Sequence, residues 1–213
     1  MNDGIKRLDP KNQTDLENTI RLHTELLPTS PVARLGPIFM RRFYYRKLVE
    51  DGLMVCNLYY HMGNPAGFMA LTSDSAGFVT RGFRRHWVSA LGVLCEMVLM
   101  DPGRIGVIYS VARTLRKRNR YVANEISGEL LSFGVLPEYR STKFIQQTNK
   151  QISLEFFESA KEYFRQIGMP AFGGMVEAKN RATILFYHSL GCQIHEVPGS
   201  DGETVKILYV FPE

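Results

Sequence analysis

Residues 131–140 read Leu-Ser-Phe-Gly-Val-Leu-Pro-Glu-Tyr-Arg and give the strongest indication of the fold class. It closes a strand predicted over Gly128–Leu136, which Pro137 ends because proline has no backbone N–H to give to a sheet. Arg140 follows on the way toward an amphipathic helix predicted over Gln151–Ile167. Strand, basic turn and amphipathic helix in that order are typical of an α/β domain.

A second segment supports the same class. Residues 180–192 read Asn-Arg-Ala-Thr-Ile-Leu-Phe-Tyr-His-Ser-Leu-Gly-Cys and follow a strand predicted over Ala171–Glu177. They predict a short helix over Asn180–Leu190. Two last strands are predicted over Gln193–Val197 and Val205–Phe211. Alternating strands and helices followed by a strand pair predict a mixed sheet with helices on its faces.

The N-terminal two thirds predict helices around one hairpin. The spacing of large apolar residues predicts helices over residues 14–27, 36–49, 87–100 and 105–118. Residues 53–62 and 66–72 are β-branched and aromatic, and the Gly-Asn-Pro turn between them predicts a hairpin. A third short strand is predicted over residues 77–82. No domain boundary stands out, so we expect a single α/β domain over residues 1–213.

Composition excludes several classes of protein. The 213 residues are 45% apolar, enough for one sizeable core. The longest apolar stretch falls short of the ~20 residues that cross a bilayer, and the polar start lacks an export signal. The three cysteines are far apart and odd in number, which argues against disulfides and suits a reducing compartment. We therefore expect a cytoplasmic protein without membrane contact.

Net charge and short motifs exclude fewer functions than composition does. A net charge of +5 could attract phosphates, but solvated surface side chains give the same sum. The densest basic run, Arg113–Arg120, is interpreted as a solvated helix end rather than as a nucleic-acid site. The five histidines show no ligand spacing, so no metal site is expected. The glycine-rich nucleotide loops and the GxSxG nucleophile motif are missing from the sequence.

The two quoted segments resemble the GNAT superfamily (Gcn5-related N-acetyltransferases). The strand-turn signature of that family, V-x-P-x-x-R, is matched by Val135, Pro137 and Arg140. Its later signature, an Asn seven residues before a Tyr and a Gly four residues after that Tyr, is matched by Asn180, Tyr187 and Gly191. The resemblance is specific over residues 128–192 and architectural upstream.

This resemblance implies a mixed, mostly antiparallel and twisted sheet, flanked by helices, with a splayed central strand pair. Residues 1–125 would form the acceptor-side half, and residues 128–192 the acyl-CoA-binding core. The implied reaction moves an acyl group from acetyl-CoA, or from a larger acyl-CoA, directly to an amine through a tetrahedral intermediate. No metal takes part in it. The acceptor is a small molecule or a peptide that the sequence does not identify, and a homodimer is left open.

The resemblance also assigns residues to the donor site. The pantetheine arm would pair with the edge of the splayed strand, where the backbone of Phe133, Gly134 and Val135 faces the thioester and its developing oxyanion. Asn180 would bind the pantetheine, although an asparagine at a helix start is also an ordinary N-cap.

Two side chains are assigned to proton transfer. Tyr187 would protonate the leaving thiolate as a general acid, and a simply packed aromatic residue is the alternative. Glu129 would serve as the base that accepts the amine proton, with Glu177 as second choice. The alternative for both carboxylates is a solvated position at a strand end. His188 is expected to point away on the surface of its helix.

The phosphate loop departs from the family pattern, which continues from the arginine as R-x-x-G-x-G/A. The chain has Lys143 and Ile145 where the glycines belong. One interpretation is a remodelled loop that holds phosphates with Arg140, Ser141, Thr142 and Lys143. The other is weakened or lost cofactor binding, which would favour a non-catalytic ligand-sensing or interaction module.

Overall fold

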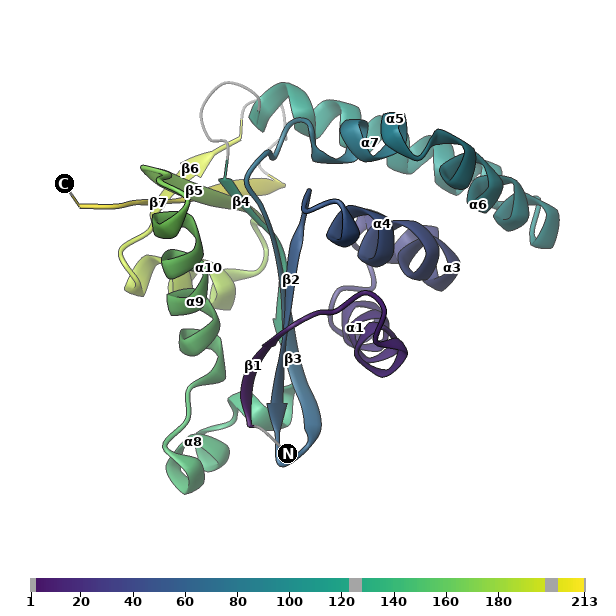
Figure 1. Ribbon diagram of the computed structural model, residues 1–213. Helices are drawn as coiled ribbons and strands as arrows, with labels where there is room; N and C mark the ends of the chain where they lie inside the picture. The colour runs from purple at the N-terminus through teal and green to yellow at the C-terminus, as the bar shows by residue number, and fades with distance from the viewer. Residues whose placement is uncertain (1–2, 123–127, 198–202, 213) are drawn as a thin grey trace.

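The computed structural model describes residues 3–122, 128–197 and 203–212, and its described strands form one seven-stranded sheet (Figure 1). The strands are β1 (Gly4–Arg7), β2 (Val55–His61), β3 (Asn64–Thr72), β4 (Gly128–Val135), β5 (Ala171–Glu177), β6 (Gln193–Glu196) and β7 (Thr204–Val210). Their spatial order is β1-β2-β3-β4-β5-β7-β6. Every neighbouring pair is antiparallel except β4 and β5, so the predicted mixed, mostly antiparallel sheet is confirmed.

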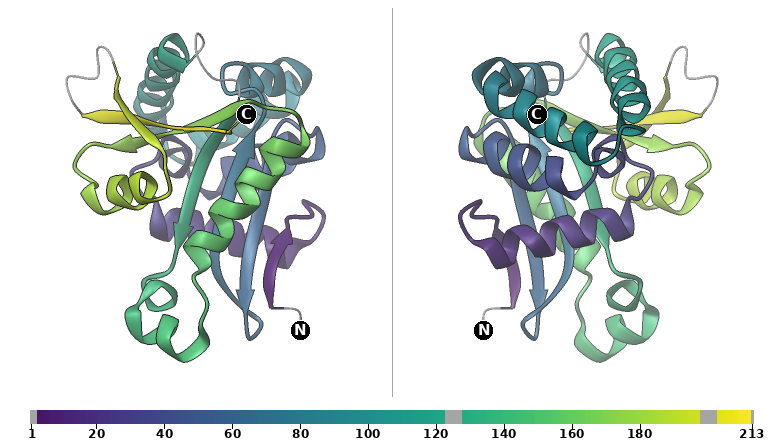
Figure 2. Two further views of the ribbon diagram at one scale, coloured as in Figure 1. Left: turned by 90° about the vertical axis from the view of Figure 1, so that its left-hand side faces the viewer. Right: turned by 90° about the vertical axis from the view of Figure 1, so that its right-hand side faces the viewer.

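Helices cover both faces of this sheet. The helical segments are α1 (Gln13–Leu26), α2 (Pro31–Leu35), α3 (Pro37–Phe39), the π-helical η1 (Met40–Tyr44), α4 (Tyr45–Glu50), α5 (Phe78–Arg85), α6 (Trp87–Met100), α7 (Arg104–Val122), the 3₁₀ turn η2 (Pro137–Arg140), α8 (Thr142–Thr148), α9 (Ile152–Gln166) and α10 (Arg181–Ser189). Figure 2 shows α1 crossing one face and α9 crossing the other. Each face has its own buried apolar cluster.

The predicted hairpin and most predicted helices are confirmed. Strands β2 and β3 pair from Val55↔Leu71 to His61↔Asn64. The helix predicted over residues 36–49 corresponds to the consecutive segments α3, η1 and α4, with a wider π-helical turn in its middle. Strand β1 and the helices α2 and α8 were not predicted.

The strand predicted over residues 77–82 is wrong, because this segment begins helix α5. Phe78 and Gly82 are buried and lie four residues apart, so they share one helix face. A Cβ atom at Gly82 would lie 2.2 Å from Leu48 Cδ2, which shows that α5 packs directly on α4. Gly82 therefore allows two helices to pack closely, and it is not part of a strand as predicted.

Strands β4 and β5 separate after only two residue pairs. Gly128 pairs with Phe172 and Glu129 with Gly173. On its other side β4 stays paired with β3 as far as Val135, and β5 stays paired with β7 as far as Glu177. The predicted splay of the central strand pair is thus confirmed, and β4 has an open edge inside the sheet.

The register of β4 determines which backbone groups face that open edge. Ala70 pairs with Ser132 and Leu71 with Leu130, so Leu131 is an extra, bulged residue. The Leu136 N–H donates to the Ala66 carbonyl at 2.9 Å. Because hydrogen-bonded and non-hydrogen-bonded pairs alternate along antiparallel strands, Phe133 and Val135 turn their N–H and C=O groups away from β3. These are the groups that face the splay.

His23 in α1 is a buried imidazole that the sequence did not single out. Its ring stacks on Phe68 with centroids 5.2 Å apart. Its two nitrogens form hydrogen bonds with the hydroxyl groups of Tyr45 and Ser30, the latter at 2.7 Å. Burial lowers the pKa of His23 to about 4, so the folded protein holds it neutral at pH 7.

This shift predicts loss of stability in mild acid. An unfolded histidine binds its proton near pH 6.5, whereas folded His23 does so only near its lowered pKa of about 4. Stability is therefore present above pH 6.5 and lost as the pH falls toward 4. We expect His23 to contribute a loss of about 2 kcal/mol between pH 7 and pH 5. Urea unfolding of the wild type and a His23→Gln variant at both pH values measures it, and equal losses in the two proteins would contradict it.

Candidate functional site

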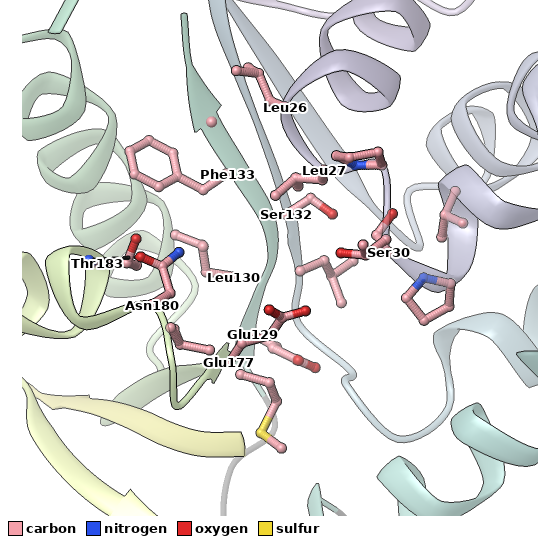
Figure 3. A pocket seen from close by; sticks show the side chains of 18 of the residues that line it. Leu26, Leu27, Ser30, Glu129, Leu130, Ser132, Phe133, Glu177, Asn180 and Thr183 are labelled. Carbon is pink, nitrogen blue, oxygen red and sulfur yellow. Dashed lines mark hydrogen bonds between the residues drawn. The ribbon is translucent and has the colours of Figure 1, made fainter. Parts of the chain in front are cut away.

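A cavity of about 1060 Å³ follows the open edge of β4 and continues among the N-terminal helices. Figure 3 shows Asn180 and Thr183, at the start of α10, on one side of β4, and Leu27 and Ser30 on the other. The strand residues 129–135 all line the cavity. A bound molecule could therefore contact the strand edge and the N-terminal helices at the same time.

The arm among the N-terminal helices is mostly apolar. Its walls come from the end of α1, from α2, α3, η1, α4, α5 and α7, and from the loop between α1 and α2. Representative apolar residues are Leu27, Val32, Phe39, Phe78, Val111 and Leu115. Ser30 and Arg34 add polar groups to the same arm. This composition favours a ligand with an apolar portion.

Phe133, Gly134 and Val135 lie in the central wall of the cavity. The Phe133 ring packs against Phe156 of α9 and Phe186 of α10, with centroids 5.8 and 6.3 Å away. A Cβ atom at Gly134 would lie 2.9 Å from Leu26 Cδ1, so glycine lets α1 approach β4 closely. The helices on both faces thus hold this part of the strand in place.

Glu129 lies where β4 and β5 part. Its residue is only 5% exposed, and its Oε2 accepts a hydrogen bond from the Ser75 hydroxyl. It lines the cavity, as Figure 3 shows, and so does Glu177. Glu177, by contrast, is exposed at the end of β5. The interpretation of Glu129 as a solvated strand-end carboxylate is therefore wrong, whereas it describes Glu177 correctly.

Tyr187 is both packed and in contact with the cavity. Its residue is 2% exposed, and its ring lies against Phe157 and Phe186 with centroids 5.9 and 5.4 Å away. It also lines the cavity wall on α10. Burial raises the pKa of Tyr187, which keeps the hydroxyl protonated. A protonated hydroxyl is the form that a proton donor requires.

The first turn of α9 forms the far end of the cavity. Residues Gln151, Ile152, Ser153 and Leu154 all line it. Gln151 precedes this 15-residue helix and makes no side-chain cap hydrogen bond. The N–H groups of a first helical turn have no partners within the helix and carry partial positive charge. This end of the cavity therefore suits an anionic group such as a phosphate.

Proteins of similar fold are found among solved structures. Neither a scan of family models nor a search of curated proteins gives a match. Among solved structures, the PaiA N-acetyltransferase from Thermoplasma acidophilum, in complex with coenzyme A, aligns with a TM-score of 0.54 and 15% identity over 99% of this chain and 100% of that one. A ribosomal-protein-alanine N-acetyltransferase from Brucella melitensis aligns with a TM-score of 0.56 and 13% identity over 97% and 99% of the two chains. The chain has the GNAT fold.

A third alignment extends the likeness. An Arabidopsis thaliana protein in complex with a bisubstrate analogue aligns with a TM-score of 0.52 and 12% identity, over 98% of this chain and 99% of that one. The alignments therefore span residues 1–125 as well as the segment that carries the two signatures. In this fold the open strand edge, the first turn of α9 and the start of α10 surround one cavity.

The loop after β4 is where this GNAT fold is unusual. Arg140 lines the cavity. Ser141 instead caps α8, with its hydroxyl accepting the Phe144 N–H at 3.2 Å, and Thr142 and Lys143 are exposed in the first turn of that helix. These three do not line the cavity, so the structure does not bring them together with the other predicted site residues. The helix that starts directly after Arg140 is α8, whereas the first helical turn that lines the cavity is that of α9, which begins at Ile152.

The start of α9 is the part of the site that sequence reasoning missed. The helix was predicted from Gln151, but phosphate contacts were assigned to the residues directly after Arg140. The signal that could have found it is the extra length between Arg140 and the end of α9, together with a helix start that lacks a strong capping residue.

Asn180 is an N-cap, and it also lies in the wall of the cavity. Its Oδ1 accepts the Thr183 N–H at 3.2 Å, as an N-cap does, and the residue is exposed and lines the cavity. His188 is exposed, as predicted. Within the described ranges, no three His, Cys, Asp or Glu side chains gather closely enough to hold a metal ion.

Proposed function

We propose that the protein is an acyl-CoA-dependent N-acyltransferase that transfers an acyl group, acetyl in the simplest case, to an amine. The observation that carries the proposal is the open edge of β4 inside the cavity. The N–H and C=O groups of Phe133 and Val135 offer an extended amide-containing chain the partners that β5 does not supply. The pantetheine arm of coenzyme A is such a chain.

The rest of the cavity fits the remaining parts of the donor. The first turn of α9 would receive the pyrophosphate, helped by the charge of Arg140 at the cavity wall. The apolar arm among the N-terminal helices lies beyond the splay and would receive the acceptor. An acceptor with an apolar portion and one amine suits this lining.

Bound acyl-CoA would supply an activated thioester. The backbone N–H of Phe133 or Val135 would stabilise the negative charge that develops on the thioester oxygen. Glu129 would accept the proton that the amine loses as its C–N bond forms. Tyr187 would protonate the sulfur as the C–S bond breaks. The supporting observation is the position of both side chains in the cavity wall.

Calorimetric titration with acetyl-CoA tests the proposal. We expect saturable binding that an Arg140→Ala substitution weakens. Lys143→Ala is the matched control, because Lys143 is exposed on α8 outside the cavity and its loss should leave the affinity unchanged. If Lys143→Ala lowers the affinity for acetyl-CoA more than Arg140→Ala does, the phosphates bind to the loop after β4 and not to the start of α9.

The alternative is a non-catalytic ligand-sensing or interaction module with this fold. The glycine-free loop after β4 favours it. Absence of binding to acetyl-CoA and to longer acyl-CoAs would support this alternative. Binding of acyl-CoA without turnover against a panel of small amines and peptides would support a sensor of acyl-CoA.

We expect a Tyr187→Phe substitution to lower kcat about 10²-fold, because the phenol would no longer protonate the leaving sulfur. Acetyl-CoA affinity should be retained, since the phenylalanine ring keeps the contacts with Phe157 and Phe186. Tyr163→Phe is the matched control, a half-buried tyrosine of α9 that does not line the cavity. Steady-state kinetics on both variants measure the effect, and full activity in the Tyr187 variant would remove its role as the acid.

A further inference from the structure

The helices α6 and α7 carry six exposed apolar side chains, which we name the apolar ridge. Its members are Trp87, Val88, Leu91, Leu99, Met100 and Ile105. Their exposed fractions range from 54% to 83%. Monomeric soluble proteins rarely expose large apolar side chains in such close succession, and a patch of this kind marks an interaction surface.

Most of the ridge lies on α6, a helix with apolar residues on its solvent side as well as on its core side. Ala90, Val93 and Met97 of α6 are buried against the core, whereas Leu91 and Leu99 point to solvent. In Figure 1, α6 extends away from the sheet, and the turn at Asp101–Gly103 forms the outer end of this extension. The ridge is therefore accessible to a large, flat partner.

The segment that carries the ridge is also the most basic part of the chain. Residues 78–122 contain nine lysines and arginines against two acidic residues, a net charge of +7. Of these, residues 78–113, which comprise α5, α6 and the start of α7, hold five arginines and both acidic residues, a net charge of +3, and residues 116–120 hold the other four cations. The whole chain carries +5, so the remaining residues together carry −2. Arg84 and Arg113 are exposed, and within the described ranges neither forms an ion pair. An anionic surface would complement the net positive charge of this segment.

From these two features we propose that α5, α6 and the start of α7 dock onto an anionic lipid surface. The ridge would lie among the acyl chains just below the headgroups, and the arginines would contact the headgroup phosphates. Trp87 suits this position because an indole favours the boundary between water and lipid. The proposal does not depend on the acyltransferase activity.

The proposed docking contradicts the expectation of a protein without membrane contact. That expectation rested on the longest apolar stretch of the sequence, which is too short to cross a bilayer. Among the described helices, none combines the length and the apolar character needed to cross a membrane. Helix α6 has 14 residues and is thus about 21 Å long, which fits a position in the plane of the interface. A second copy of the chain is a weaker partner, since a two-fold contact would bring the arginine-rich segments of both copies together.

Trp87 is the only tryptophan of the chain, so the tryptophan fluorescence of the protein reports on the ridge alone. Purified full-length protein is mixed with vesicles of phosphatidylcholine alone, or of phosphatidylcholine with one third phosphatidylglycerol. With the anionic vesicles we expect co-flotation, reversal by high salt, and a blue shift of the tryptophan emission. Vesicles of phosphatidylcholine alone should bind much less protein.

Two double variants separate docking through the ridge from a general effect of added negative charge. The double variant Leu91→Glu with Leu99→Glu should lower the partition onto anionic vesicles about tenfold or more, because it places charge where the ridge enters the lipid. The matched control is Met62→Glu with Leu185→Glu, which changes two leucine-sized side chains, 77% and 67% exposed, elsewhere on the surface. All four side chains are exposed, so both variants should fold, which circular dichroism checks.

Three results would overturn the proposal. The first is absence of wild-type binding to anionic vesicles at low salt. The second is an equal loss of binding in the two double variants, which would leave net charge as the cause. The third is a wild-type dimer in analytical ultracentrifugation that the Leu91→Glu, Leu99→Glu variant dissolves, without vesicle binding. In that case the ridge would be the contact between two copies of this chain.

Discussion

Replacing Glu129 by glutamine is expected to lower kcat by about 10²–10⁴-fold, the range typical of a lost general base. Glutamine keeps the size and shape of the side chain and its capacity to accept the Ser75 hydrogen bond. It loses the capacity to take the amine proton. The affinity for acetyl-CoA should therefore stay the same while turnover falls.

The comparison with Glu177→Gln isolates this role. Both carboxylates line the cavity, but Glu129 is buried beside Ser75 at the splay, whereas Glu177 is exposed at the end of β5. We expect the Glu177 variant to keep most of its turnover. Steady-state kinetics with saturating acetyl-CoA and calorimetric titration of each variant provide the measurement. If the Glu129 variant turns over like the wild type and the Glu177 variant does not, the two assignments are reversed.

A Phe156→Ala substitution is expected to cost about 3–5 kcal/mol of the free energy of unfolding. Phe156 is 0% exposed and lies at the start of α9 against the sheet, with its ring 5.8 Å from Phe133 and 6.0 Å from Tyr59. A Cβ atom at Gly67 would lie 3.1 Å from Phe156 Cε2, so the ring fills its space tightly. Alanine would leave a cavity directly beneath the open edge of β4.

Phe164→Ala is the matched control for this prediction. Phe164 is also 0% exposed on α9 but stacks on Phe172, with centroids 4.6 Å apart, away from the open part of β4. Urea unfolding should show a similar loss in both variants. Acetyl-CoA affinity should fall only in the Phe156 variant, because only that one loosens Phe133. If either alanine variant does not fold, the leucine variants repeat the comparison at smaller cost. Equal affinities in two folded variants would contradict a role of Phe156 in supporting the site.

The sequence predicted the order of elements well because their signals are local. The proline that ends β4 and the turn between β2 and β3 depend on neighbours in the chain. The splay followed from the resemblance carried by Val135, Pro137 and Arg140, and the pairing of β4 confirms it. The helix α5 was mistaken for a strand because the partner of Gly82 is Leu48, a contact between distant residues.

The candidate site was predictable only in part, for the same reason. Tyr187, Asn180 and residues 133–135 were assigned from the motifs, and all of them line the cavity. The burial of Glu129 depends on Ser75, which lies 54 residues earlier in the chain. The start of α9 became a cavity wall because α8 is inserted before it, a rearrangement that composition does not reveal. The apolar ridge also escaped notice, because an apolar helix pattern does not tell which of its faces is covered.

The open edge of β4 would be a hazard on the outside of a protein, because unpaired strand edges recruit other strands and promote aggregation. Here the edge lies in a recess between the end of α1 and the start of α10, with Leu26 and Phe186 among the residues that line it. The flanking helices thereby keep the unpaired backbone away from the strands of other molecules and leave it open to an extended chain inside the cavity.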